Sequence, residues 1–174
     1  GSGFQIAARI LGVSQAREYG LNGQGVGIVF GIGYVVAALA SQSYPKIKKY
    51  VKIPILILGI TTILLSSFLL AKYIGLIFGA VFIISRIATS AVFDNTKSRM
   101  INGVVSSKNR ATALSTLSLL IQLPYAVFAY MIGSYLDAQS PNAFAFLLGI
   151  LLFALIGIQL ILAYRTRMFK VIST

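Results

Sequence analysis

The sequence predicts an all-α integral membrane protein that is built as a six-helix bundle. Hydrophobic residues make up 57% of the 174 residues and charged residues only 10%, whereas soluble domains carry about 25% charged residues. The apolar residues lie in runs that are long enough to cross a hydrocarbon core of ~30 Å as helices, at 1.5 Å per residue. We therefore expect about five full membrane spans and one partial helix at the N-terminal end.

The N-terminal stretch is the least regular part. Gly1-Ser2-Gly3 is interpreted as an artificial scar or a linker and is excluded from the bundle. Residues 4–19 are helix-like but short, and they carry Arg9 and Arg17. Such a segment cannot span a bilayer alone, so a partial helix is predicted, with a helix lying in the membrane interface as the alternative.

The first full span is expected over residues 23–42, where glycines recur at strict four-residue spacing. Gly23, Gly27 and Gly31 share one helix face, and small residues at this spacing let membrane helices approach closely. A phosphate-binding loop is excluded, because the required strand and motif order are missing. The glycines therefore predict a helix-packing face, and Tyr34 is the bulky polar-tipped residue on it.

The next two spans differ in polarity. Residues 53–71 hold only hydroxyl groups, which can bond to backbone carbonyls of their own helix. Residues 73–93 contain Arg86, and an ionisable group within a span is a functional hypothesis by default. Ser90 follows one turn later on the same face, so both residues are predicted to line a solute cavity.

The fifth span, residues 110–136, carries a polar stripe on an otherwise apolar helix. Its members follow steps of three and four: Ser115, Ser118, Gln122, Tyr125 and Ala129. Pro124 removes a backbone donor and can bend the helix there, which favours a cavity position for its neighbours Gln122 and Tyr125. The last span, residues 142–164, is almost wholly apolar.

These features resemble one known family. Arg110-Ala-Thr-Ala-Leu-Ser after a basic loop, with Gly133-x-x-x-Asp137 at the far end, resembles the eleventh transmembrane helix of major facilitator superfamily transporters. The spacing of the other spans agrees with the carboxy-terminal half of that family. The resemblance implies helices seven to twelve, the first incomplete, and an amino-terminal bundle in the same chain or a separate one. It also implies a three-plus-three inverted repeat that works by alternating access.

Basic residues indicate the orientation of the bundle. Eleven of the fifteen fall on one side of the predicted membrane: Lys46, Lys48, Lys49, Lys52, Lys97, Arg99, Lys108, Arg110, Arg165, Arg167 and Lys170. This asymmetry predicts that these loops and the C-terminus are cytoplasmic, in an inner or plasma membrane. Asp94 is the acid nearest this basic face, and Arg110 is its favoured partner in a cytoplasmic gate, with a preceding lysine as the alternative.

Composition restricts the function. The chain has no His and no Cys, and its three acids, Glu18, Asp94 and Asp137, lie at different predicted membrane levels. No catalytic site, metal site or cofactor is therefore expected, and nucleic acid is not an expected partner because the basic residues follow the membrane pattern. The function that the composition still allows is the passage of a small-molecule substrate through a lipid bilayer. The alternatives are a small six-helix substrate-binding subunit of a multi-component uptake transporter, and a structural or chaperone-like membrane module.

Overall fold

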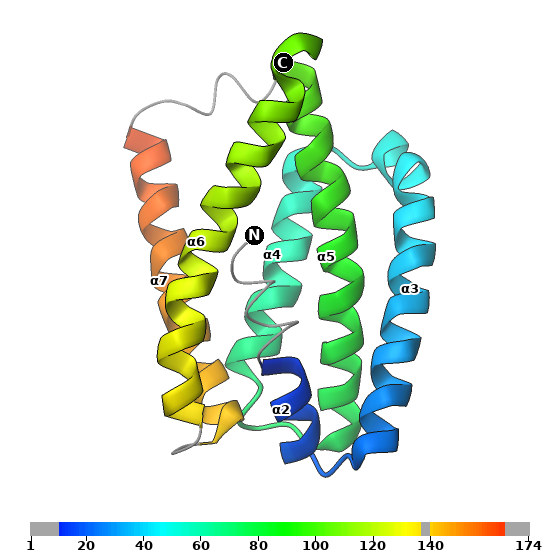
Figure 1. The fold of residues 1–174 in the computed structure, drawn as a ribbon, viewed down its shortest axis with the longest axis vertical. Helices are drawn as coiled ribbons and strands as arrows, with labels where there is room; N and C mark the ends of the chain where they lie inside the picture. Colours follow the sequence, from blue (N-terminus) through cyan, green and yellow to red (C-terminus); the bar gives the residue numbers. More distant parts are fainter. Residues whose placement is uncertain (1–10, 137–139, 166–174) are drawn as a thin grey trace.

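A computed structural model of the chain describes residues 11–136 and 140–165, and these residues form helices joined by short links. Figure 1 shows that consecutive long helices run in alternating directions, and that the short first helix lies at the end where α3 begins. The elements in order are α2 (Gly12–Glu18), α3 (Gly23–Tyr50), α4 (Ile53–Leu69), α5 (Leu76–Val104), the 3-10 turn η2 (Ser107–Asn109), α6 (Arg110–Leu136) and α7 (Pro141–Arg165).

Three helices in the described residues are long and apolar enough to cross a membrane: α3, α5 and the Pro141–Gln159 part of α7. The apolar helix α4, with 17 residues, is shorter and lies at the lower limit of a spanning length. The all-helical class is therefore confirmed, and the chain has the helices of a membrane protein. Only three of the five expected full spans meet these criteria of length and composition.

Two helices are longer than the sequence predicted. The span expected to end at residue 42 continues as α3 to Tyr50, and the span expected to end at residue 93 continues as α5 to Val104. The basic stretches that were predicted to be loops are thus largely helical. Lys and Arg are good helix formers, so their appearance marks the edge of the hydrocarbon region and not the end of a helix.

Local signals explain how α3 begins. Gly20 has a φ of 96°, which is the left-handed region that favours glycine, and it reverses the chain after α2. The Asn22 side chain then accepts a hydrogen bond from the Gly25 backbone N–H at 2.8 Å and caps α3. α2 and α3 are consequently joined by a tight link, which holds α2 against the bundle.

The start of α7 is also capped. The Ser140 hydroxyl accepts a hydrogen bond from the Ala143 N–H at 3.2 Å, and Pro141 occupies the first helical position. A hydroxyl followed by proline is a common start signal for a helix.

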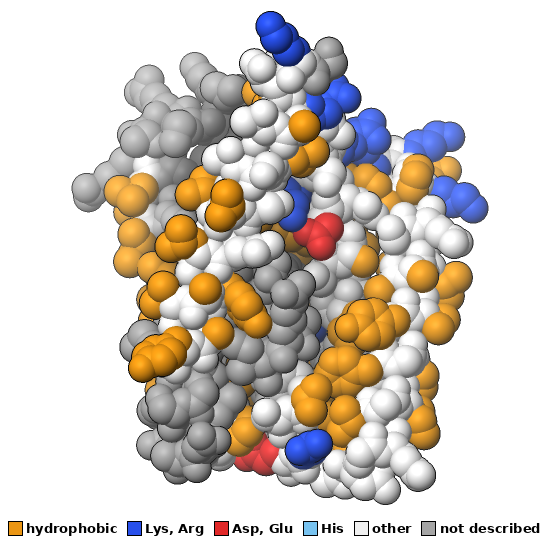
Figure 2. All heavy atoms as spheres, in the orientation of Figure 1, with side chains coloured by type: hydrophobic (Ala, Val, Ile, Leu, Met, Phe, Trp, Pro, Cys, Tyr) orange, Lys and Arg blue, Asp and Glu red, His pale blue; other side chains and the backbone are white. Residues whose placement is uncertain are grey.

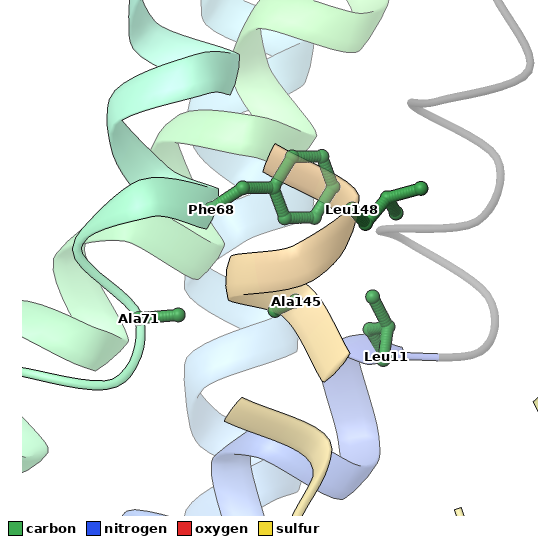
Figure 3. Packing of buried hydrophobic residues seen from close by; sticks show 5 residues of the cluster. All are labelled: Leu11, Phe68, Ala71, Ala145 and Leu148. Carbon is green, nitrogen blue, oxygen red and sulfur yellow. The ribbon is translucent and has the colours of Figure 1, made fainter. Parts of the chain in front are cut away.

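The core consists of small apolar clusters between the helices. Figure 3 shows the first, the Phe68 cluster, in which α2, α4 and α7 meet through Leu11, Phe68, Ala71, Ala145 and Leu148. The second, the Ile83 cluster, joins α2, α3 and α5 through Ala16, Val29, Ala37, Ile83 and Ile87. α5 packs against α3, α4, α2 and α6, so it is the central helix of the bundle.

Candidate functional site

The most unusual side chain in the interior is Arg86, on the central helix α5. It is only 3% exposed. Ten residues of helix separate it from Leu76, so it lies roughly 15 Å along a helix that is long enough to span the bilayer. The sequence identified this residue because its charge interrupts an apolar run, and the structure places it in the interior between helices.

In the part of the chain that the structure describes, the charge of Arg86 has no acidic partner. Its guanidinium carbon lies 5.4 Å from the centre of the Phe68 ring, which is a cation–π contact. Its Nε and Nη1 atoms are buried and have no hydrogen-bond partner among the described residues. A buried charge is unfavourable unless it is paired and hydrogen-bonded, and one aromatic ring replaces only a small part of the lost hydration.

A polar network that the sequence did not predict lies at the same end of the bundle as α2. Gln15, fully buried, donates from Nε2 to Oδ1 of Asn142 at 3.0 Å. The Glu18 carboxylate accepts the Asn142 backbone N–H at 2.8 Å and the Ser140 hydroxyl. A carboxylate at the N-terminus of α7 also complements the helix dipole, so this network fixes α2 to α7.

Tyr19 connects this network with the central helix. Its hydroxyl donates to the Ala71 carbonyl at 3.1 Å, and its ring lies directly on the backbone of α5 at Gly79. Tyr19 therefore holds the end of α2 against α5 at Gly79, two helical turns from Arg86. The available signals in the sequence were Gln15 and Glu18 one turn apart and the Ser140-Pro141-Asn142 start of α7.

The structure does not bring all of the predicted cavity residues together. Ser90 lies one turn beyond Arg86 on α5 and is half-buried. Tyr125 is half-buried and packs on the Phe68 cluster, whose aromatic member contacts Arg86. Tyr34 is 64% exposed on α3, and Gln122 is exposed on α6, so these two lie on the surface of the bundle.

The predicted packing role of Gly23, Gly27 and Gly31 is not found within the bundle. A Cβ atom added at any of them would meet nothing within 4 Å in the described structure. Close approach of helices depends instead on Gly33, where a Cβ would lie 2.7 Å from Cδ1 of Ile87, and on Gly79. Four-residue spacing identified a face of small residues, but the face that turns toward α5 is the one that carries Gly33.

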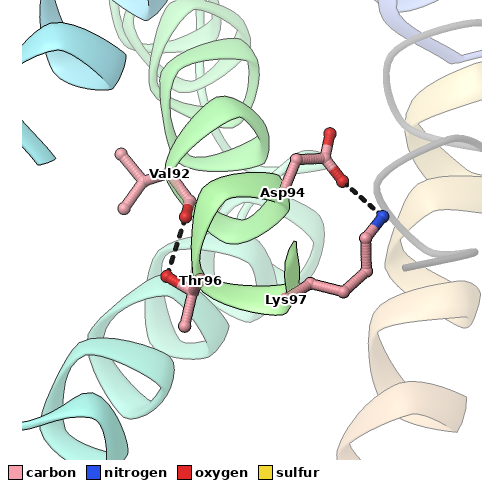
Figure 4. A network of polar contacts seen from close by, with 4 residues as sticks. All are labelled: Val92, Asp94, Thr96 and Lys97. Atoms are coloured by element: carbon pink, nitrogen blue, oxygen red, sulfur yellow. Dashed lines mark hydrogen bonds and ion pairs between the residues drawn. The ribbon is translucent and has the colours of Figure 1, made fainter. Parts of the chain in front are cut away.

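At the basic end, Asp94 pairs with a lysine of its own helix. Figure 4 shows Lys97 Nζ 2.7 Å from Asp94 Oδ1, an i,i+3 pair in which the Asp94 side chain is 61% exposed. This is the only ion pair in the part of the chain that the structure describes. Arg110, the favoured partner, does not contact Asp94 in this conformation, and its buried Nε has no partner among the described residues.

An open hollow of about 460 Å³ follows α6 and is separate from the Arg86 region. Steps of three and four place its lining on the face of α6 that is roughly opposite Tyr125. The residues that line it are Asn109, Thr112, Ala113, Thr116, Leu117 and Leu120. It carries no charged side chain, so it offers a weak binding surface and no chemistry.

The described residues contain no group of three or more side chains that could hold a metal ion. The described interior therefore presents a fixed positive charge, a few hydroxyl and amide groups, and apolar side chains. Comparison of the chain with protein-family models, with curated proteins and with solved structures finds no match in any of the three.

Proposed function

We propose that this chain is one helical bundle of a secondary transporter, the carboxy-terminal half of a major facilitator fold, which moves a small solute by alternating access. The observation that carries the proposal is Arg86, a buried charge on an apolar helix of spanning length that has no acidic partner among residues 11–136 and 140–165. Ionisable groups at membrane depth are expensive, and they commonly mark the path of a solute or an ion.

The distribution of charge supports the same proposal. Figure 2 shows Lys and Arg side chains gathered at one end of the molecule, over the far ends of α3 and α5. This is the arrangement expected of a membrane protein whose basic end is cytoplasmic. We propose that this end faces the cytoplasm, with α3 and α5 projecting beyond the hydrocarbon region through their basic final turns.

The exposed polar groups also fit a half transporter. Tyr34 on α3 and Gln122 on α6 lie on the bundle surface, and an exposed amide in lipid would be unfavourable. In a two-bundle transporter this surface is covered by the amino-terminal bundle, or it faces a water-filled path between the two bundles. Gly27 and Gly31, beside Tyr34 on the same face of α3, would then allow a helix of the other bundle to approach.

The proposal is tested by the accessibility of neighbouring positions on α6. The chain contains no cysteine, so single cysteines can be introduced without background labelling. Gln122 and Leu120 are both exposed on the bundle surface, but two residues of helix turn them about 200° apart. We expect Gln122→Cys in membrane vesicles to react rapidly with a water-soluble thiol reagent, and Leu120→Cys to react slowly.

Equal labelling of the two cysteines would contradict a water-lined face on α6. Binding offers a second measurement, because the site of a half transporter lies between two bundles. Tight binding of a small solute by this chain alone would contradict the proposal and favour a substrate-binding subunit. Uptake of a solute by vesicles that contain the complete transporter would support the proposed transport function.

The proposed cytoplasmic gate gives a second prediction. The exposed Asp94–Lys97 pair is worth only about 0.5 kcal/mol, so Asp94→Asn is expected to leave the thermal stability nearly unchanged.

If Asp94 pairs with Arg110 when the gate is closed, Asp94→Asn and Arg110→Gln should each raise the labelling of cysteines at the inner face. Each substitution would then destabilise the closed state alone, and only a difference between states shifts the population. The charge-swapped double variant restores low labelling at least in part. Additive effects of the two substitutions would mean that the residues never meet.

A further inference from the structure

We infer that Arg86 binds an anionic group of the solute, a carboxylate or an oxyanion such as inorganic phosphate, in the complete transporter. This inference rests on the proposed transport function and adds the substrate class to it. The site is centred on the guanidinium on α5 and its contact with the Phe68 ring on α4. Two buried donors, Nε and Nη1, have no acceptor among the described residues.

The two acids within the described residues do not supply the missing negative charge. Glu18 is engaged by the Asn142 N–H and the Ser140 hydroxyl at the start of α7. Asp94 is paired with Lys97, two helical turns from Arg86 and roughly 12 Å along the axis. Asp137, the third and last acid of the sequence, lies outside the described residues. A net positive charge therefore remains in the interior of the described bundle.

The existing contacts of Arg86 do not compensate this charge. One cation–π contact stabilises a desolvated cation by less than the free energy that is lost when a charged group is withdrawn from water. A carboxylate or phosphate oxygen accepts charge-assisted hydrogen bonds from guanidinium nitrogens, and these are about twice as strong as neutral ones. A cationic solute would be repelled, and a neutral solute would leave the charge uncompensated.

The depth of Arg86 decides between two sources of such an oxyanion. Lipid headgroups lie at the bilayer surface, but Arg86 lies roughly 15 Å along α5 and is 3% exposed. A lipid headgroup at the bilayer surface does not reach this depth, so the inference commits to a free solute. The basic residues at the far end of the bundle are the ones placed to meet lipid phosphates.

Thermal unfolding of the purified complete transporter in detergent, with both bundles present, tests the inference, with helicity as the signal. Sodium acetate and sodium phosphate serve as anion probes at constant ionic strength, and choline chloride serves as the cation control. We expect a saturating probe anion to raise the midpoint of unfolding by about 5 °C or more, because a ligand that binds only the folded state stabilises it. Choline chloride should give no shift, and added anionic lipid should not replace the effect.

Matched variants assign the effect to Arg86. Arg99→Gln removes an exposed charge from the same helix and should keep the shift, whereas Arg86→Gln should abolish it. Arg86→Lys keeps the charge without the planar fork and should keep a reduced shift, so the test does not depend on one variant that fails to fold. The inference is overturned by an equal shift in Arg86→Gln, or by the absence of any anion shift in the unchanged protein.

Uptake by reconstituted vesicles separates the inference from the proposed function. Transport of a neutral or cationic solute without an anion shift would overturn the substrate class and leave the transport function standing. An anion shift that depends on Arg86, in a complete protein that moves no solute across the bilayer, would overturn the transport function and leave the anion site standing. Arg86-dependent uptake of an anion supports both.

Discussion

Replacing Arg86 by leucine is expected to reduce solute uptake by about tenfold to a hundredfold while the protein remains folded. A hydrogen bond to a charged group is worth about 1.5–3 kcal/mol, which corresponds to this range in an equilibrium constant. Arg86→Leu removes that interaction from the solute. The measurements are initial uptake rates in reconstituted vesicles and the midpoint of thermal unfolding.

Arg86→Leu is expected to leave the stability unchanged or to raise it, which is unusual for a substitution of a buried residue. Arg86 is buried and has no acidic partner among the described residues, so its removal leaves no other buried charge unpaired. Exchanging buried ionic groups for apolar ones of similar size is often neutral or stabilising, by about 1–4 kcal/mol. The variant should therefore unfold at an unchanged or higher temperature.

Arg99→Leu is the matched control, because Arg99 is an exposed arginine on the same helix. It should change neither uptake nor stability to a comparable extent. A variant at Arg86 that unfolds readily and keeps its transport rate would show that the arginine has a structural role. Opposite changes in uptake and stability at position 86 would agree with a charge that is retained for function.

Much of the fold could be predicted from apolar runs. The helix predicted over residues 110–136 corresponds to α6, Arg110–Leu136, and the helix predicted over 142–164 corresponds closely to α7. The ends of α3 and α5 were predicted too early, because hydropathy reports the edge of the membrane and lysine and arginine continue a helix past it. Pro45 also lies inside α3, so neither this proline nor the lysines that follow it end the helix.

The candidate site could be predicted only in part. Arg86 was detectable because a single charge in an apolar run has few explanations. Periodicity shows which residues share a face, but it does not show which face a neighbour covers. The Gly27 face of α3 therefore proved to be open, and the Gly33 face packs against Ile87. The contacts of Gln15 and Glu18 with Asn142 join residues more than 120 positions apart, and no local pattern in the chain predicts such a pairing.

Gly79 is expected to be the glycine whose substitution destabilises the bundle most. A Cβ atom at this position would lie 2.5 Å from Cε2 and 2.9 Å from Cγ of the Tyr19 ring. The ring cannot slide away freely, because its hydroxyl donates to the Ala71 carbonyl at 3.1 Å and α2 is fixed to α7 through Glu18. Gly79→Ala should therefore lower the free energy of unfolding by about 1–3 kcal/mol.

The control for this substitution is Gly59→Ala on α4, where an added Cβ meets open space. It removes a flexible residue from a helix interior and should be neutral or stabilising by up to about 1 kcal/mol. The comparison separates the close approach of α2 from the general effect of replacing a helical glycine.

A second substitution shows whether the Tyr19 ring is the cause. Tyr19→Leu alone loses the hydrogen bond to Ala71 and part of the ring packing, so it is destabilising too. In the double variant Gly79→Ala with Tyr19→Leu, the smaller side chain makes room for the new methyl group, and the combined loss should be clearly less than the sum of the two. Strictly additive losses would mean that α2 does not lie against α5 at Gly79. A coupling of about 0.5–3 kcal/mol, the range found for residues in contact, would show that α2 lies against α5 at Gly79.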